Sequence, residues 1–118
     1  MSGASPSLTA GVALLGRLRG VRGVVLTSLD DALPIASSAH VDVDVDALAA
    51  IAADIYRRAI VTAKTTNAGA VRRVSLEAEG GRLVAASRGT MLLVVLAEHE
   101  TNPGLLRLSV QRALEELA

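Results

Sequence analysis

The sequence predicts an α/β domain in which one five-stranded antiparallel sheet carries helices on both faces. The chain has 118 residues, which is enough for one compact domain and hardly enough for two. Hydrophobic residues make up 51% of it and charged residues only 20%, so there is ample apolar surface to bury. Apolar spacing alternates between helical and extended in the order helix, strand, strand, helix, strand, strand, strand, helix, and the short connections between strands favour antiparallel hairpins.

The chain is expected to begin with a tail and a helix. We expect residues 1–6 to form a flexible tail and residues 7–118 to form a single domain. Ser7 is a plausible N-cap for the first helix, which is expected to end near Gly20. The apolar residues of this helix recur at spacings of three and four: Leu8, Val12, Leu15 and Leu18.

A β-hairpin is expected next. Residues 21–29 are β-branched and apolar, residues 30–32 are turn-like, and residues 33–39 can return as the second arm. Proline has no N–H to donate to a sheet, so Pro34 is expected at the start or the edge of that second arm.

The strongest helix signal covers residues 46–66, which contain no proline or glycine, with Asp46 as the expected N-cap. Two apolar strips run along this helix. The first comprises Leu48, Ile51, Ala52, Ile55, Ala59 and Ala63, and the second comprises Ala49, Ala53, Tyr56 and Ile60. A surface helix of a monomer needs only the first strip, so the second predicts that another surface covers it, and its alanines would allow a close approach.

Three strands and a helix are expected in the C-terminal half. Glycine-containing turns separate the segments 71–79, 82–87 and 90–98. The first is mixed in polarity and is expected at a sheet edge, whereas the third is apolar without alternation and is expected at the centre, covered on both faces. Asn102 caps the last helix, and Pro103 takes its first position. The expected buried stripe of that helix is Leu106, Val110, Ala113, Leu114 and Leu117.

The composition argues against several classes of partner. Twelve basic and twelve acidic residues give no net charge, and the only aromatic residue is a tyrosine, so neither charge nor base stacking favours nucleic acid. The absence of cysteine removes disulfides and thiol chemistry. The longest apolar run, residues 91–97, is far shorter than the roughly 20 residues of a membrane-spanning helix. We therefore expect a soluble, cytoplasmic protein with no membrane insertion.

The stretch most like a metal site is residues 40–46, in which aspartate alternates with valine. A calcium loop that starts at Asp42 needs glycine at its sixth position and glutamate at its twelfth, but Ala47 and Ala53 stand there. We expect no metal site. Asp42 and Asp44 are instead interpreted as solvated charges near the positive end of the long helix.

No catalytic or cofactor-binding residue is expected. The single lysine, Lys64, lies within the long helix, and no phosphate-binding Gly-x-x-x-x-Gly-Lys pattern precedes it. His40 and His99 are the only candidate bases for the serines, and neither stands in a nucleophile-elbow sequence. Arg57, beside Tyr56, has two interpretations: an arginine finger that reaches a partner's phosphates, or an anchor in an interface.

Two stretches carry a resemblance to a known family. They are residues 20–38 (GVRGVVLTSLDDALPIASS) and residues 81–107 (GRLVAASRGTMLLVVLAEHETNPGLLR). The chain resembles the roadblock family, the dynein light chain roadblock type with its bacterial and archaeal relatives, and the resemblance runs from residue 8 to the C-terminus. One departure concerns the hairpin turn, which often has the sequence Asp-Gly in this family. Residues 30–33 here are Asp-Asp-Ala-Leu instead.

The resemblance implies a profilin-like α/β fold that dimerises through its long helix, residues 46–66, and the neighbouring edge strand, residues 71–79. It also implies no enzymatic activity and no nucleotide binding, but binding of Ras-like small GTPases with modulation of GTP hydrolysis. The expected partners are therefore a second copy of the chain and such a GTPase. The expected interface residues are Ala49, Ala53, Tyr56, Arg57, Ile60, Val71, Arg73 and Ser75.

Two alternatives stay open beside the GTPase regulator. A dimeric scaffold would assemble larger proteins and leave GTP hydrolysis unchanged. A small ligand-binding sensor would use the sheet to hold a ligand, but no polar cluster among the apolar strands favours it.

Overall fold

The computed structural model describes residues 6–117 and has the expected order of elements. The helices are α1 (Pro6–Gly16), α2 (Val45–Thr65) and α3 (Pro103–Glu115). The strands are β1 (Val21–Ser28), β2 (Pro34–Ala39), β3 (Arg73–Ala78), β4 (Gly81–Arg88) and β5 (Met91–Ala97). They form one sheet in the order β2-β1-β5-β4-β3, in which every neighbouring pair is antiparallel. The expected five-stranded antiparallel sheet, with β5 at its centre and β3 at an edge, is confirmed, and β2 forms the other edge.

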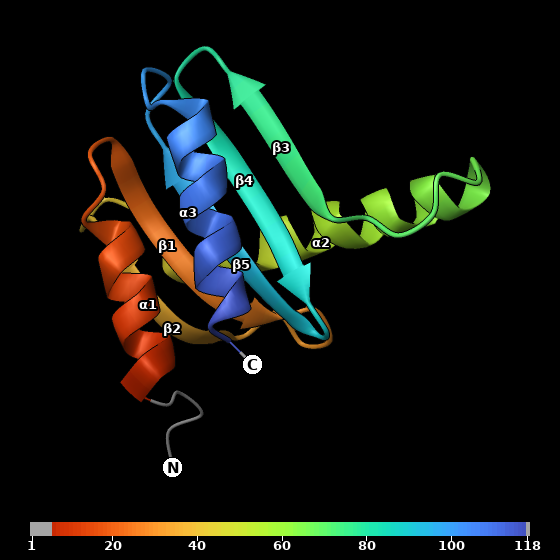
Figure 1. Cartoon of the computed structure of the whole chain (residues 1–118), viewed down its shortest axis with the longest axis horizontal. Helices are drawn as coiled ribbons and strands as arrows, with labels where there is room; N and C mark the ends of the chain where they lie inside the picture. Colours follow the sequence, from red (N-terminus) through yellow and green to blue (C-terminus); the bar gives the residue numbers. More distant parts are fainter. Residues whose placement is uncertain (1–5, 118) are drawn as a thin grey trace.

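The helices cover opposite faces of this sheet: α1 and α3 lie on one face and α2 on the other (Figure 1). Successive residues of the central strands point to opposite faces. Leu93 and Val95 therefore belong to the cluster beneath α1 and α3, and Leu92 and Val94 to the cluster beneath α2. Burial on both faces explains why the sequence of β5 is apolar without alternation.

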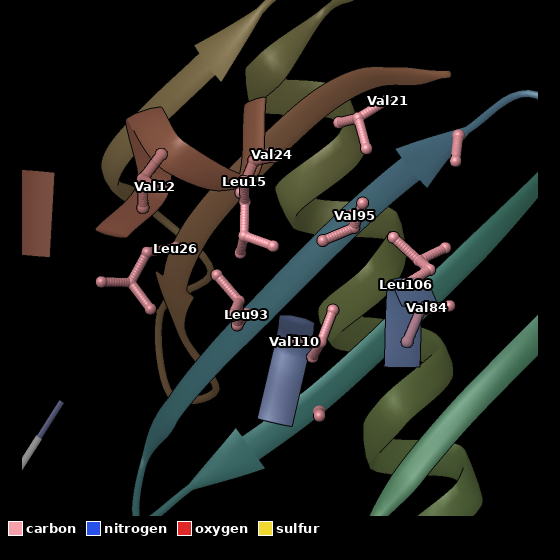
Figure 2. Packing of buried hydrophobic residues seen from close by; sticks show 12 residues of the cluster. Val12, Leu15, Val21, Val24, Leu26, Val84, Leu93, Val95, Leu106 and Val110 are labelled. Carbon is pink, nitrogen blue, oxygen red and sulfur yellow. The ribbon is translucent and has the colours of Figure 1, made fainter. Parts of the chain in front are cut away.

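The larger cluster lies between the sheet and the helix pair α1 and α3. Figure 2 shows Val12 and Leu15 from α1 and Leu106 and Val110 from α3 against side chains of the sheet. Arg88 fixes the far end of α3, because its Nη1 donates to the carbonyl oxygens of Leu114 at 3.0 Å and Glu115 at 2.9 Å. The stripe expected on the last helix is confirmed: Leu106 and Val110 are buried, and Ala113, Leu114 and Leu117 pack against the same cluster.

The bounds of the first helix differ from those expected. The predicted tail, residues 1–6, lies outside the described residues apart from Pro6, which already belongs to α1. Ser7 is therefore inside the helix, and its prediction as N-cap is wrong. The helix also ends at Gly16, four residues earlier than expected, and Gly20 then adopts a φ of +89°, a conformation that glycine takes without steric cost.

The first hairpin contains an irregularity where the sequence departs from the usual turn. Pro34 begins the edge strand β2, as expected, and the register with β1 shifts between Leu26 and Thr27. Ala32 has a φ of 58°, which is a left-handed conformation that favours glycine. The buried Thr27 hydroxyl donates to the carbonyl oxygen of Leu33 at 2.8 Å and so ties the turn to the sheet.

One of the two predicted helix caps is correct. Asn102 caps α3, because its Oδ1 accepts from the backbone N–H of Leu105 at 3.0 Å. In α2 the cap is Asp44, whose Oδ1 accepts from the backbone N–H of Ala47 at 3.0 Å. The prediction of Asp46 as N-cap is wrong: Asp46 lies in the first turn, where its charge faces the positive end of the helix.

Candidate association surface

Three residues of the predicted interface are buried within the chain itself. Ala49 and Ala53 have no exposed surface and Tyr56 is 1% exposed, and all three pack in the cluster between α2 and the sheet. The prediction that these side chains lie on an outer strip of the helix is wrong. The physical reason is that alanines of both predicted strips let α2 lie close to its own sheet, so Ala52 of the first strip faces β1, β4 and β5 together with these three residues of the second.

The hydroxyl of Tyr56 joins α2 to two other segments. It donates to the carbonyl oxygen of Val71 at 3.0 Å and lies 2.8 Å from Oγ of Ser87. A phenol has one proton and the carbonyl can only accept, so Ser87 donates to the tyrosine oxygen. Tyr56 therefore holds the segment that precedes β3 against β4.

The apolar side chains left outside on α2 are Ile51, Ile60 and Val61, which are 57%, 40% and 63% exposed. Ile60 was expected at an interface, whereas Ile51 was expected to face the sheet. Val61 belongs to neither of the two predicted strips. Ile60 follows Tyr56 by one turn, but the sheet no longer lies beneath it.

The reason is that the C-terminal half of α2 extends past the sheet. All four buried residues of the helix lie at or before Tyr56. Figure 1 shows the helix continuing beyond β3 before the chain turns back. Asn67 makes that return with a φ of 59°, as expected for a helix end, and Ala68 N–H donates to the carbonyl oxygen of Ala63 at 2.8 Å. We call residues 57–66 the overhang.

Strand β3 forms the free edge of the sheet beside the overhang. Within residues 6–117 its only partner strand is β4, in the register Arg73 with Ala86 and Ser75 with Val84. Val74 packs in the cluster beneath α2, so Arg73 and Ser75 point to the opposite face, towards the side of α3. Both are exposed, and Val71, just before the strand, is half-buried. The structure thus separates these predicted residues: Val71 lies near the overhang, while Arg73 and Ser75 do not face α2.

Arg57 and Arg58 lie on the overhang and bond within the chain. Arg57 Nη1 donates to the carbonyl oxygen of Leu29 at 2.7 Å, which links the overhang to the end of β1. Arg58 pairs with Asp54, one turn earlier, with its Nε 3.0 Å from Oδ2. Arg57 is exposed and has four further guanidinium N–H donors, so it can still contact a partner.

Within residues 6–117 the structure shows no group of three or more histidine or acidic side chains placed to hold a metal ion. Asp42 is paired with Arg22 instead of converging with Asp44 and Asp46. In the same part of the chain, no helix is both long and apolar enough to span a bilayer.

Comparison with known proteins identifies the family. The sequence pattern of the Roadblock/LC7 domain matches residues 11–97. The chain belongs to this family. The chain is also similar to an uncharacterized protein of Methanocaldococcus jannaschii, with 30% identity over 103 residues that cover 87% of this chain and 90% of the relative.

Solved structures share the fold of this chain. The MglB protein of Myxococcus xanthus superposes with a TM-score of 0.86 at 23% identity, over 95% of this chain and 92% of that one. Profilin IB of Acanthamoeba castellanii superposes with a TM-score of 0.63 at 18% identity, over 93% of this chain and 95% of that one. The expected profilin-like roadblock fold is therefore confirmed, and at these identities the likeness concerns the fold alone.

Proposed function

We propose that the chain is a non-enzymatic homodimer that binds a Ras-like small GTPase and modulates its GTP hydrolysis. The observation that carries the dimer is the position of the unpaired β3 edge beside the overhang of α2. An edge strand presents unpaired backbone groups, and exposed apolar side chains next to it mark a surface that another protein covers. Membership of the Roadblock/LC7 family supports the same surface, because the resemblance implies dimerisation there.

The geometry suggests how two copies meet. Pairing of β3 with the β3 of a second copy about a two-fold axis would join the two sheets into one. Each overhang would then extend over the other copy, where Ile60 and Val61 would find the apolar contact that their own sheet does not supply. The two α2 helices would form a platform on one side of the joined sheet, which is the surface that we assign to the GTPase.

The association step is tested by light scattering of the purified chain. We expect about twice the mass of 12.1 kDa at micromolar concentration. Ile60→Asp would place a charge in the interface and give a folded monomer, because an unpaired buried charge costs several kcal/mol. Val41→Asp is the matched control, since Val41 is fully exposed in the loop before α2. A wild-type monomer, or equal effects of both variants, would contradict the proposed dimer.

The regulatory step is tested by single-turnover GTP hydrolysis with a Ras-like GTPase from the same organism. We expect the wild-type chain to change the rate and the Ile60→Asp monomer to leave it unchanged. Arg57→Ala distinguishes the two roles left open for that residue: lost stimulation with intact binding indicates an arginine finger, and lost binding indicates an anchor. A complex that forms without any change in rate would favour the alternative, a dimeric scaffold.

A further inference from the structure

A basic groove lies on the face of the sheet opposite α2, between α3 and β3. It consists of two adjoining hollows of about 300 and 330 Å³, and Arg73 and Arg107 line both. Arg72 lines the second hollow and Arg82 the first. We refer to these four arginines and the surface between them as the basic groove. It lies on the sheet face opposite the α2 platform, and its rim residues Arg72 and Arg73 stand beside the β3 edge that is proposed above to pair with a second copy.

The groove exists because α3 covers only part of the sheet. Leu106 and Val110 hold this helix over the middle strands, so no helix lies in front of β3 (Figure 1). The residues of β4 that line the groove are the apolar Val84 and Ala86, which pair with Ser75 and Arg73, and Arg82 at one end. The floor of the groove is thus apolar, and its rims are polar.

The rims carry an excess of positive charge. Among the described residues, Arg72, Arg73 and Arg107 make no ion pair. Arg82 pairs with Glu77 at 2.6 Å, and its buried Nε has no hydrogen-bond partner. Of the residues that the structure describes, Glu77 is the only acidic one that lines either hollow. Three uncompensated arginines therefore face one groove in a chain whose net charge is zero.

We propose that the basic groove binds an acidic peptide segment of a partner protein. Carboxylates of the segment pair with Arg73 and Arg107, which stand on opposite rims, and its apolar side chains contact Pro103, which is exposed at the first hollow, and the aliphatic stems of the arginines. The planar guanidinium groups of arginine suit this partner, because they bind carboxylates through two parallel hydrogen bonds. Charge complementarity supplies the orientation, and the apolar contacts with Pro103 and the arginine stems supply area to bury.

The same features disfavour other polyanions. Binding of single-stranded nucleic acid relies on stacking of its bases on aromatic side chains. The only aromatic side chain of the sequence, Tyr56, is buried on the other side of the sheet. A lipid bilayer is flat and contacts projecting apolar residues, whereas the arginines here line a groove whose floor residues, Val84 and Ala86, are only 4% and 3% exposed. A peptide fills such a groove.

The test is a selection from a random linear peptide library on the immobilised full chain. We expect the enriched peptides to combine clustered glutamate or aspartate with apolar residues. The best peptide, labelled with a fluorophore, is then titrated against variants in anisotropy measurements. Arg107→Gln should weaken binding about three- to tenfold, as loss of a charged contact does, and the double variant Arg73→Gln/Arg107→Gln should weaken it further.

Arg112→Gln is the matched control, because it removes the same charge from the same helix on the side that faces α1. It should leave peptide affinity within about twofold of the wild type, since surface charges far from a ligand contribute little. Enriched peptides without acidic residues, or equal losses for Arg107→Gln and Arg112→Gln, would overturn the proposal. Tighter groove-dependent binding to phosphatidylserine vesicles or to single-stranded DNA than to any selected peptide would overturn it as well.

Discussion

Tyr56 shows why individual residues of the candidate surface were misplaced by sequence reasoning. Tyrosine and arginine side by side are typical of interfaces, and this favoured an outward position. In the structure the tyrosine hydroxyl satisfies its hydrogen bonds inside the chain, with Val71 and Ser87. Val71 and Ser87 lie 15 and 31 residues away, so no local pattern reveals them. The neighbouring Arg57, in contrast, is exposed as expected.

The aspartates before α2 provide a prediction at the same scale. Asp44→Ala removes the side chain that accepts from Ala47 N–H and should lower the free energy of unfolding by about 1 kcal/mol. Asp46→Ala removes the same charge from the first turn but no cap, and should cost about 0.3 to 0.5 kcal/mol. Urea denaturation of both variants measures the difference. A larger loss for Asp46→Ala would show that the cap lies two residues later.

At the scale of elements, the type and order of all eight helices and strands could be predicted from spacing and turn residues. The side of α2 that faces the sheet could not. Its two apolar strips are adjacent on the helix, and alanine fits either a sheet or a partner, so the sequence leaves both orientations open. Packing decides between them, because Ala49, Ala52 and Ala53 give the closest approach to the strands.

Helix α1 offers a matched pair of glycines. A Cβ at Gly11 meets nothing within 4 Å, so Gly11→Ala should stabilise the chain by about 0.5 to 1 kcal/mol through helix propensity. A Cβ at Gly16 would lie 2.9 Å from Cβ of Ser38 and overlap its hydroxyl, so Gly16→Ala should destabilise by about 1 to 3 kcal/mol. Thermal unfolding of both variants checks the signs. A stabilising Gly16→Ala would mean that α1 does not pack closely on β2.

At the scale of the whole molecule, the sequence predicted β5 at the centre of the sheet and β3 at an edge, as the structure has them. It could not reveal the basic groove, because Arg73, Arg82 and Arg107 come from three separate elements. Their convergence depends on the register of β3 with β4 and on where α3 crosses the sheet. Such a site has no local signature, and only the assembled fold brings it together.

A dimer also makes stability depend on concentration. Because unfolding would release two chains, each tenfold increase in protein concentration should add about 1.4 kcal/mol to the apparent free energy of unfolding of the pair. Urea midpoints of the wild type should rise accordingly, and those of Ile60→Asp should not. A midpoint that is independent of concentration for the wild type would contradict an obligate pair.

The overhang of α2 has a consequence for amide hydrogen exchange. Its backbone hydrogen bonds lie beyond the sheet, so in an isolated chain these turns would open and close without unfolding the remainder. A second copy would slow that opening by covering the overhang, and the protection of these few amides would then report the fraction of paired chains. A platform built on such turns would be ordered only above a threshold abundance. Recognition of its target would rise steeply, and not in proportion, as the protein accumulates.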